Sequence, residues 1–237
     1  MRQGVLLSAD IDFMVHGVFS YEIFGQTVWI TTTHVCLLIV ILALIAVAFA
    51  VNRVMQRATE VPGGVQNAAE LVVEMLDGMV KGNMGKSAYK FMNYIGTIFI
   101  FILISNISGL FGLRPPTADY GVTLPLGLMT FTLIQYNKFK YQKVSGVIKG
   151  LCDPWPIWAP INIIGEIAVP ISLSLRLFAN ILSGTVMLAL VYGLLSIIAI
   201  GWPAVLHVYF DLFSGAIQTY VFCMLTMTYI ADAIGDK

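Results

Sequence analysis

The chain alternates long apolar stretches with short polar ones. Residues 29–51 and 91–113 carry no formal charge, and each is longer than the roughly 18 apolar residues that mark a membrane-spanning helix. Counted as an apolar stretch, the first of these begins near residue 28. Three further apolar stretches cover about 121–137, 160–200 and 204–231. We therefore predict an all-α integral membrane protein with about five spans, forming a single membrane domain of residues 1–237 with no internal repeat.

The last two apolar stretches predict a long helical hairpin over about 160–231. As one helix, residues 160–200 would be about 60 Å long, twice the roughly 30 Å thickness of the hydrocarbon core. Such a helix must tilt strongly, bend or break, and Pro170 is an available kink. The sequence Gly201-Trp202-Pro203 then turns the chain into the last helix.

Polar segments separate the spans. "RPPTAD" at 114–119 is a turn signal between the second and third spans. After Pro62-Gly63-Gly64, residues 65–80 place apolar positions at helical i, i+3, i+4 spacing and acidic positions on the other face. This pattern predicts a cytoplasmic surface helix. Its acidic face either contacts a protein partner or is simply solvated.

Composition agrees with a lipid-embedded protein. The chain is 58% hydrophobic and only 11% charged, whereas a soluble domain carries about 25% charged residues. The formal net charge is zero, which indicates no nucleic-acid partner. Cys36, Cys152 and Cys223 show neither a disulfide framework nor metal-ligand spacing. The N-terminal residues lack a signal-peptide pattern, so we expect the first span to be kept as an anchor.

Lysine and arginine in the segments between spans predict the orientation. The 52–90 and 138–158 segments, treated as loops, hold nine of these residues: Arg53, Arg57, Lys81, Lys86, Lys90, Lys138, Lys140, Lys143 and Lys149. The segments that would lie on the opposite side of the membrane hold only Arg2 and Arg114. With five crossings, this rule places the N-terminus outside and the C-terminus in the cytoplasm.

Three formal charges fall inside predicted spans: Glu166, Arg176 and Asp211. Each would cost roughly 3 kcal/mol at mid-membrane, so such groups face a protein interior or a water-filled cavity. Arg176 is a permanent cation because arginine does not deprotonate in proteins. One alternative is a structural Arg176–Asp211 ion pair between the two helices of the hairpin.

The other possibility is a hydrated path. Helical geometry places a polar stripe on each helix of the hairpin: Ser172, Arg176, Asn180 and Ser183 on one, and Asp211, Ser214 and Gln218 on the other. A fixed arginine in such a path blocks the direct passage of cations.

These segments resemble a known family. "PISLSLRLFANILSG" followed by "GAIQTYVFCMLTMTYI" is similar to subunit a of the F-type ATP synthase membrane sector, and "FILISNISGL" and "PTADYGVTLPLGL" resemble that family's second and third spans. The resemblance covers nearly the whole chain beyond about residue 25. It implies a stator beside a rotating ring of c subunits, with ions entering and leaving through two offset half-channels. It also implies association with peripheral-stalk b subunits, the soluble catalytic head and the lipid bilayer.

The resemblance assigns roles to single residues. The family's essential arginine matches Arg176, which would attract the ionised ring carboxylate and separate the half-channels. Asn180 and Gln218 match polar residues near that arginine, Ser183 shares its stripe, and Asn106 matches a residue associated with the outer path. Asp119 belongs to the "PTAD" motif and is expected to form a turn. Glu166 either lines the cytoplasmic exit or is a structural acid.

One departure concerns the outer half-channel. Many family members carry an acid nine positions after the arginine, paired with a histidine on the last helix. Here those positions are Thr185 and Asp211, so the acid has moved across the helix pair. We predict that Asp211 is the main ionisable group of the outer path and that Thr185 faces it. His207 and His34 are assigned no role.

The subunit is expected to be non-catalytic on its own and to need no cofactor, while the choice between H⁺ and Na⁺ stays open. The competing class is a secondary ion-coupled transporter. Such transporters usually show internal repeats and paired broken helices, which this sequence lacks. It also lacks the His-Glu-x-x-His and Gly-x-Ser-x-Gly motifs of membrane hydrolases.

Overall fold

The computed structural model describes residues 17–23, 26–58, 63–152, 155–194 and 202–235. Within these ranges the chain is predominantly helical, which confirms the predicted all-α membrane class. The helices are α1 (Thr32–Met55), α2 (Gly64–Met84), α3 (Ala88–Ile107), α4 (Tyr120–Leu151), α5 (Ala159–Leu194), α6 (Trp202–His207) and α7 (Gly215–Ile234). A π-helical segment, Val208–Ser214, joins α6 to α7 without a break.

Among the described residues, four helical stretches are long and apolar enough to cross a membrane: Thr32–Met55, Tyr89–Phe111, Pro156–Val191 and Val205–Ile234. They correspond to four of the five predicted spans. Their apolar side chains largely face outward, as on α1, where Leu38, Val47 and Phe49 are more than half exposed. An apolar exterior of this kind needs lipid around it.

The expected third span, 121–137, is the first half of α4. The prediction that residues 138–158 form a loop is wrong for residues 138–151, because the helix continues through them to Leu151. Its proline, Pro125, lies in the second turn from the start. The next proline along the chain is Pro154, so no proline ends the helix earlier. Lys138, Lys140 and Lys149 therefore lie on a helix. That α4 crosses the membrane as a fifth span stays a prediction.

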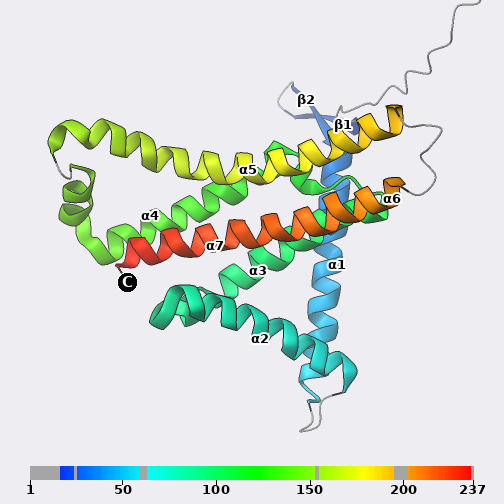
Figure 1. Cartoon of the computed structure of the whole chain (residues 1–237), viewed down its shortest axis with the longest axis horizontal. Coiled ribbons are helices and arrows are strands. Elements are labelled where there is room, and N and C mark those ends of the chain that lie inside the picture. The colour runs from blue at the N-terminus through cyan, green and yellow to red at the C-terminus, as the bar shows by residue number, and fades with distance from the viewer. Residues whose placement is uncertain (1–16, 24–25, 59–62, 153–154, 195–201, 236–237) are drawn as a thin grey trace, which may run out of the picture.

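The two long C-terminal helical segments form the predicted hairpin. In Figure 1, α5 and the α6–α7 segment run along the long axis of the molecule, and α1 crosses them steeply. Pro170 lies inside α5, and the helix continues past it to Leu194. With α1 crossing the bilayer, α5 and α7 are strongly inclined, which is how a helix longer than the hydrocarbon core is accommodated. The predicted turn begins at Gly201, which lies outside the described residues.

The core joins α2, α3, α4, α5 and α7. Its fully buried members include Val80 on α2, Ile95 and Ile102 on α3, Leu177 on α5 and Met227 on α7. Helix α4 packs against both α5 and α7. A Cβ added to Gly127 of α4 would lie 2.7 Å from the Pro170 carbonyl oxygen of α5. Only a glycine therefore allows the two backbones to approach this closely.

Helix α2 confirms the predicted helix after Gly63-Gly64. Only part of its apolar stripe is covered by the rest of the chain: Leu76, Val80 and Met84 are buried, whereas Leu71 and Met75 are more than half exposed.

A two-stranded antiparallel hairpin precedes α1 and was not predicted. Its strands are β1 (Gly17–Ile23) and β2 (Gln26–Thr31), with Ser20 opposite Trp29. The first helix therefore begins at Thr32 rather than near residue 28, because the β-branched and aromatic residues before Thr32 pair as a strand.

Candidate functional site

Helix α5 positions Arg176 on its outer flank. The residues of α5 that face the rest of the chain recur at helical spacing, and they include Pro170, Leu173, Ser174, Leu177 and Ile181. Arg176 is off this face, and its side chain is exposed.

Arg176 makes no hydrogen bond or ion pair with any residue in the described ranges. Asp211 Oδ2 instead lies 2.9 Å from His207 Nδ1, so the alternative of an Arg176–Asp211 pair between the hairpin helices is wrong. A permanent cation on an apolar helix therefore points away from its own chain, where a partner can reach it.

The polar stripes of the hairpin meet next to Arg176. Ser214 Oγ donates a hydrogen bond of 3.1 Å to Asn180 Oδ1 across the two helices. Asn180 Nδ2 is buried and has no hydrogen-bond partner among the described residues, and the same is true of Gln218 Nε2, one turn beyond Ser214. Buried amide donors are normally satisfied. These two open amide donors, one on each helix of the hairpin, are therefore available to bind water.

Asp211 lies in the π-helical segment. His207 Nδ1 is 2.9 Å from Asp211 Oδ2 on the same helix. The carboxylate also packs against Gly109, where an added Cβ would lie 3.1 Å from Asp211 Cγ and 3.3 Å from each carboxylate oxygen. Single π-helical turns are frequent at functional sites, because they re-aim side chains within a helix. Here the π-helical turn holds an acid between a histidine and a glycine.

Thr185 and Ser183 do not reach across the hairpin. The Thr185 hydroxyl donates to the Leu182 carbonyl at 2.8 Å, and the Ser183 hydroxyl donates to the Asn180 carbonyl at 3.0 Å. The two helices do approach at this level, because a Cβ added to the neighbouring Gly184 would lie 3.4 Å from Phe210 Cβ. That Thr185 faces Asp211 stays a prediction.

Asn106 is fully buried on α3, and its amide is engaged on both sides. Asn106 Nδ2 donates to the Gly215 carbonyl at 3.0 Å and to Thr219 Oγ1 at 3.3 Å, while Asn106 Oδ1 accepts from Thr117 Oγ1 at 2.7 Å. These bonds tie α3 and the turn before α4 to the start of α7. The association of Asn106 with the outer path stays a prediction.

Asp119 is the N-cap of α4. Its Oδ1 accepts a hydrogen bond of 2.8 Å from the Gly121 backbone N–H. This is the side-chain capping that favours aspartate at the start of a helix, as the turn signal predicted.

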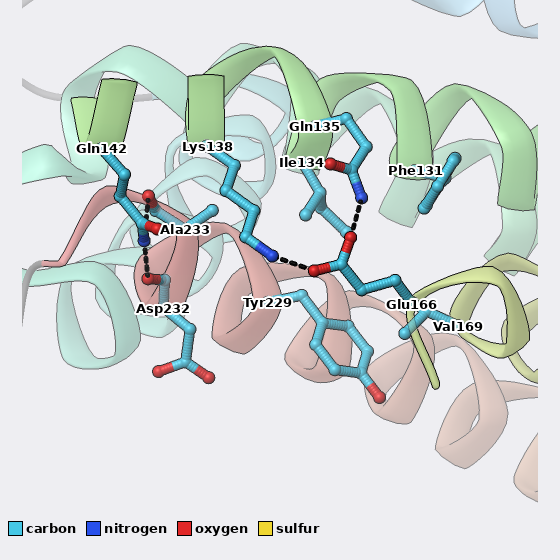
Figure 2. A pocket seen from close by; sticks show the side chains of 10 residues that line it. All are labelled: Phe131, Ile134, Gln135, Lys138, Gln142, Glu166, Val169, Tyr229, Asp232 and Ala233. Atoms are coloured by element: carbon cyan, nitrogen blue, oxygen red, sulfur yellow. Dashed lines mark hydrogen bonds and ion pairs between the residues drawn. The ribbon is translucent and has the colours of Figure 1, made fainter. Parts of the chain in front are cut away.

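Glu166 lines a pocket of about 260 Å³ between α4, α5 and α7. Both of its carboxylate oxygens have a partner on α4: Lys138 Nζ forms an ion pair with Oε1, and Gln135 Nε2 donates to Oε2 at 3.1 Å. Figure 2 shows these two side chains reaching from α4 toward Glu166. The acid is therefore held by a cation and an amide, and it also borders a hollow.

The sequence of residues 34–231 matches the profile of the family described as ATP synthase A chain. The chain belongs to this family. Subunit a of Propionigenium modestum, described as sodium ion specific, is 40% identical over 192 residues, which cover 74% of this chain and 65% of that protein. Subunit a of Desulforamulus reducens is 37% identical over 177 residues (72% and 68%), and subunit a of Moorella thermoacetica is 32% identical over 197 residues (83% and 87%).

Two residues of the candidate site in this subunit a family protein were not assigned from the sequence: His207 and Lys138. His207 was assigned no role, although its i, i+4 spacing to Asp211 was a visible signal. Lys138 was counted only as a loop charge, because no sequence signal pairs it with Glu166 across 28 positions.

Proposed function

We propose that this chain is the stator ion-channel subunit of a rotary ATP synthase, which couples ion flow through two offset half-channels to rotation of a c-ring and to ATP synthesis. The catalytic head performs the ATP chemistry, and this subunit is non-catalytic. The family match supports the assignment to the membrane sector and gives no support to a secondary transporter.

The observation that carries the proposal is the exposed Arg176 without a partner among the described residues. A fixed cation on a membrane helix needs a compensating anion. The ionised carboxylate of a ring subunit would supply that anion each time it passes α5. A lysine would serve less well, because burial can neutralise an ammonium group whereas a guanidinium stays charged.

Polar groups on either side of Arg176 support the two half-channels. On the outer side, Asp211 with His207 would collect the cation, and Asn180, Ser214 and Gln218 would lead it toward the ring, with Ser183, Thr185 and Asn106 nearby. On the cytoplasmic side, Glu166 would line the exit. No straight path then joins the two sides, because Arg176 separates them.

The transported ion is H⁺ or Na⁺, and no cofactor is involved. The sodium specificity in the name of the Propionigenium relative makes Na⁺ a specific candidate here. The proposed partners are the c-ring and the peripheral-stalk b subunits. The proposed location is the bacterial plasma membrane, with the N-terminus outside and the C-terminus in the cytoplasm.

The test uses the whole ATP synthase in inverted membrane vesicles. The chain should copurify with the c-ring and the soluble ATPase. Arg176→Ala and Arg176→Lys should each abolish ATP-driven ion transport, or nearly so, without loss of assembly. Full coupled transport in either assembled variant would make Arg176 structural and overturn the proposal.

A further inference from the structure

The pocket at Glu166 has a neighbouring pocket at the junction of α4 and α5. A second pocket of about 550 Å³ is lined by residues at the end of α4 and the start of α5, including Gly150, Asn162 and Gly165. Glu166 and Val169 line both pockets. The Glu166 carboxylate therefore lies where two accessible hollows meet.

The positive charge next to the Glu166 carboxylate is that of Lys138. The side chains of Lys138 and Glu166 are 20% and 29% exposed, so the pair is partly accessible although neither group is fully exposed. Asp232 and Tyr229 of α7 also line the pocket. Figure 2 shows the Asp232 carboxylate and the Tyr229 hydroxyl pointing away from the pair. Among the described residues, Lys138 is the cation paired with Glu166.

A half-buried carboxylate without a cation beside it attracts a small monovalent cation and releases it slowly. At an effective dielectric constant of about 20, two unit charges 4 Å apart interact by about 4 kcal/mol. An ammonium group held on the carboxylate offsets much of this attraction, and Gln135 satisfies the other oxygen. The same carboxylate can then bind a passing cation briefly and release it.

We propose that Lys138 is a positioning residue for Glu166, the acid placed above at the cytoplasmic exit: it weakens the hold of Glu166 on the transported cation, H⁺ or Na⁺, and so keeps release to the cytoplasm fast. This inference rests on the proposed function. Glu166 lies ten positions before Arg176 on α5, which is about 15 Å along the helix at 1.5 Å per residue. Glu166 is thus clearly separated from the arginine that faces the ring.

The test changes Lys138 in the complete ATP synthase in inverted vesicles, where the cytoplasmic side is accessible. ATP-driven transport is measured while the cytoplasmic pH and Na⁺ concentration are varied separately, so that the transported cation is identified. Lys138→Gln should lower the half-saturating concentration of that cation several-fold, because Glu166 then holds it more tightly. ATP synthesis, which releases the cation to the cytoplasm, should slow. Lys138→Arg should behave like the unchanged protein.

Lys149→Gln is the matched control, since it removes an exposed lysine from the same helix and should change neither quantity. In a Glu166→Gln background, Lys138→Gln should produce no further shift. If Lys138→Gln fails to assemble, Gln135→Leu removes the other contact and should shift the half-saturating concentration in the same direction by a smaller factor.

If the half-saturating concentration is unchanged in assembled Lys138→Gln, this inference is overturned; the same holds for assembled Gln135→Leu where that variant is used instead. An equal shift caused by Lys138→Gln in the Glu166→Gln background would also overturn it. The Arg176→Ala variant in the same vesicles separates the two proposals. If it abolishes transport while the pocket variants change nothing, only the role of Lys138 is refuted. If Arg176→Ala transports normally, the proposed stator function is itself refuted.

Discussion

His207 Nδ1 and Asp211 Oδ2 lie 2.9 Å apart on one helix, across a π-helical turn. The family resemblance implied an acid–histidine pair that spans two helices, with its acid at the position of Thr185. In this chain the acid has a histidine partner one turn earlier on its own helix. In the proposed outer path, Thr185 therefore does not need to carry a charge.

The first prediction concerns the charge of Asp211. Asp211→Asn keeps the shape of the side chain but removes the carboxylate that we propose collects cations, so ATP synthesis in vesicles should fall by at least tenfold. Copurification with the c-ring should be unchanged. His207→Gln keeps a polar partner beside Asp211 and should have a smaller effect.

The double change Thr185→Glu with Asp211→His returns the acid to the neighbouring helix. It should restore part of the activity lost in Asp211→Asn. Normal synthesis in Asp211→Asn would show that the outer path runs elsewhere.

The second prediction concerns Gly109, where an added Cβ would lie 3.1 Å from Asp211 Cγ. Gly109→Ala should push the carboxylate by a few tenths of an ångström and reduce transport several-fold, because small displacements of a reacting group are costly. Gly78→Ala on α2 is the control, since its added Cβ meets nothing within 4 Å. Equal transport in the two assembled variants would mean that the contact does not position Asp211.

The third prediction concerns stability. Asn106→Ala would leave the buried Thr117 hydroxyl without its acceptor and remove a donor from the Gly215 carbonyl. Leaving a buried polar group unsatisfied costs about 1–3 kcal/mol. The detergent-solubilised complex should therefore release this subunit at a lower temperature, as measured by a thermal dissociation series. Thr97→Ala on the same helix, whose hydroxyl is exposed and bonds within α3, should change the dissociation temperature much less. The same dissociation temperature for Asn106→Ala and the unchanged complex would rule out the structural role.

The fourth prediction concerns orientation. After replacement of Cys36, Cys152 and Cys223, single cysteines at Arg57 and Ile157 should react with a membrane-impermeant thiol reagent only from the cytoplasmic side. A cysteine at Phe111, which is 79% exposed, should react only from outside. Labelling of Phe111→Cys and Ile157→Cys from the same face would show that α4 does not cross the membrane.

Much of the fold follows directly from the sequence. Long uncharged runs such as 32–51 can only satisfy their backbone in lipid as helices, and the turn signal at 114–119 marks the start of α4. The extent of α4 was missed because its second half is rich in lysine, and lysines with few helix breakers continue a helix as readily as they form a loop. The hairpin before α1 was missed because its strands are too short to carry a clear periodic signal.

The sequence alone identified the chemically unusual residues of the site, since a charge in an apolar run is visible without a structure: Glu166, Arg176 and Asp211. The i, i+4 spacing of His207 and Asp211 was also visible in the sequence. Only the tertiary structure decided the surroundings of the other two charges: Glu166 is held by Lys138 and Gln135, and Arg176 faces outward. The reason is physical. Helical periodicity fixes which face of its own helix a side chain occupies. The residue that meets that face from another helix depends on how α4, α5 and α7 pack, and no local sequence pattern determines that packing.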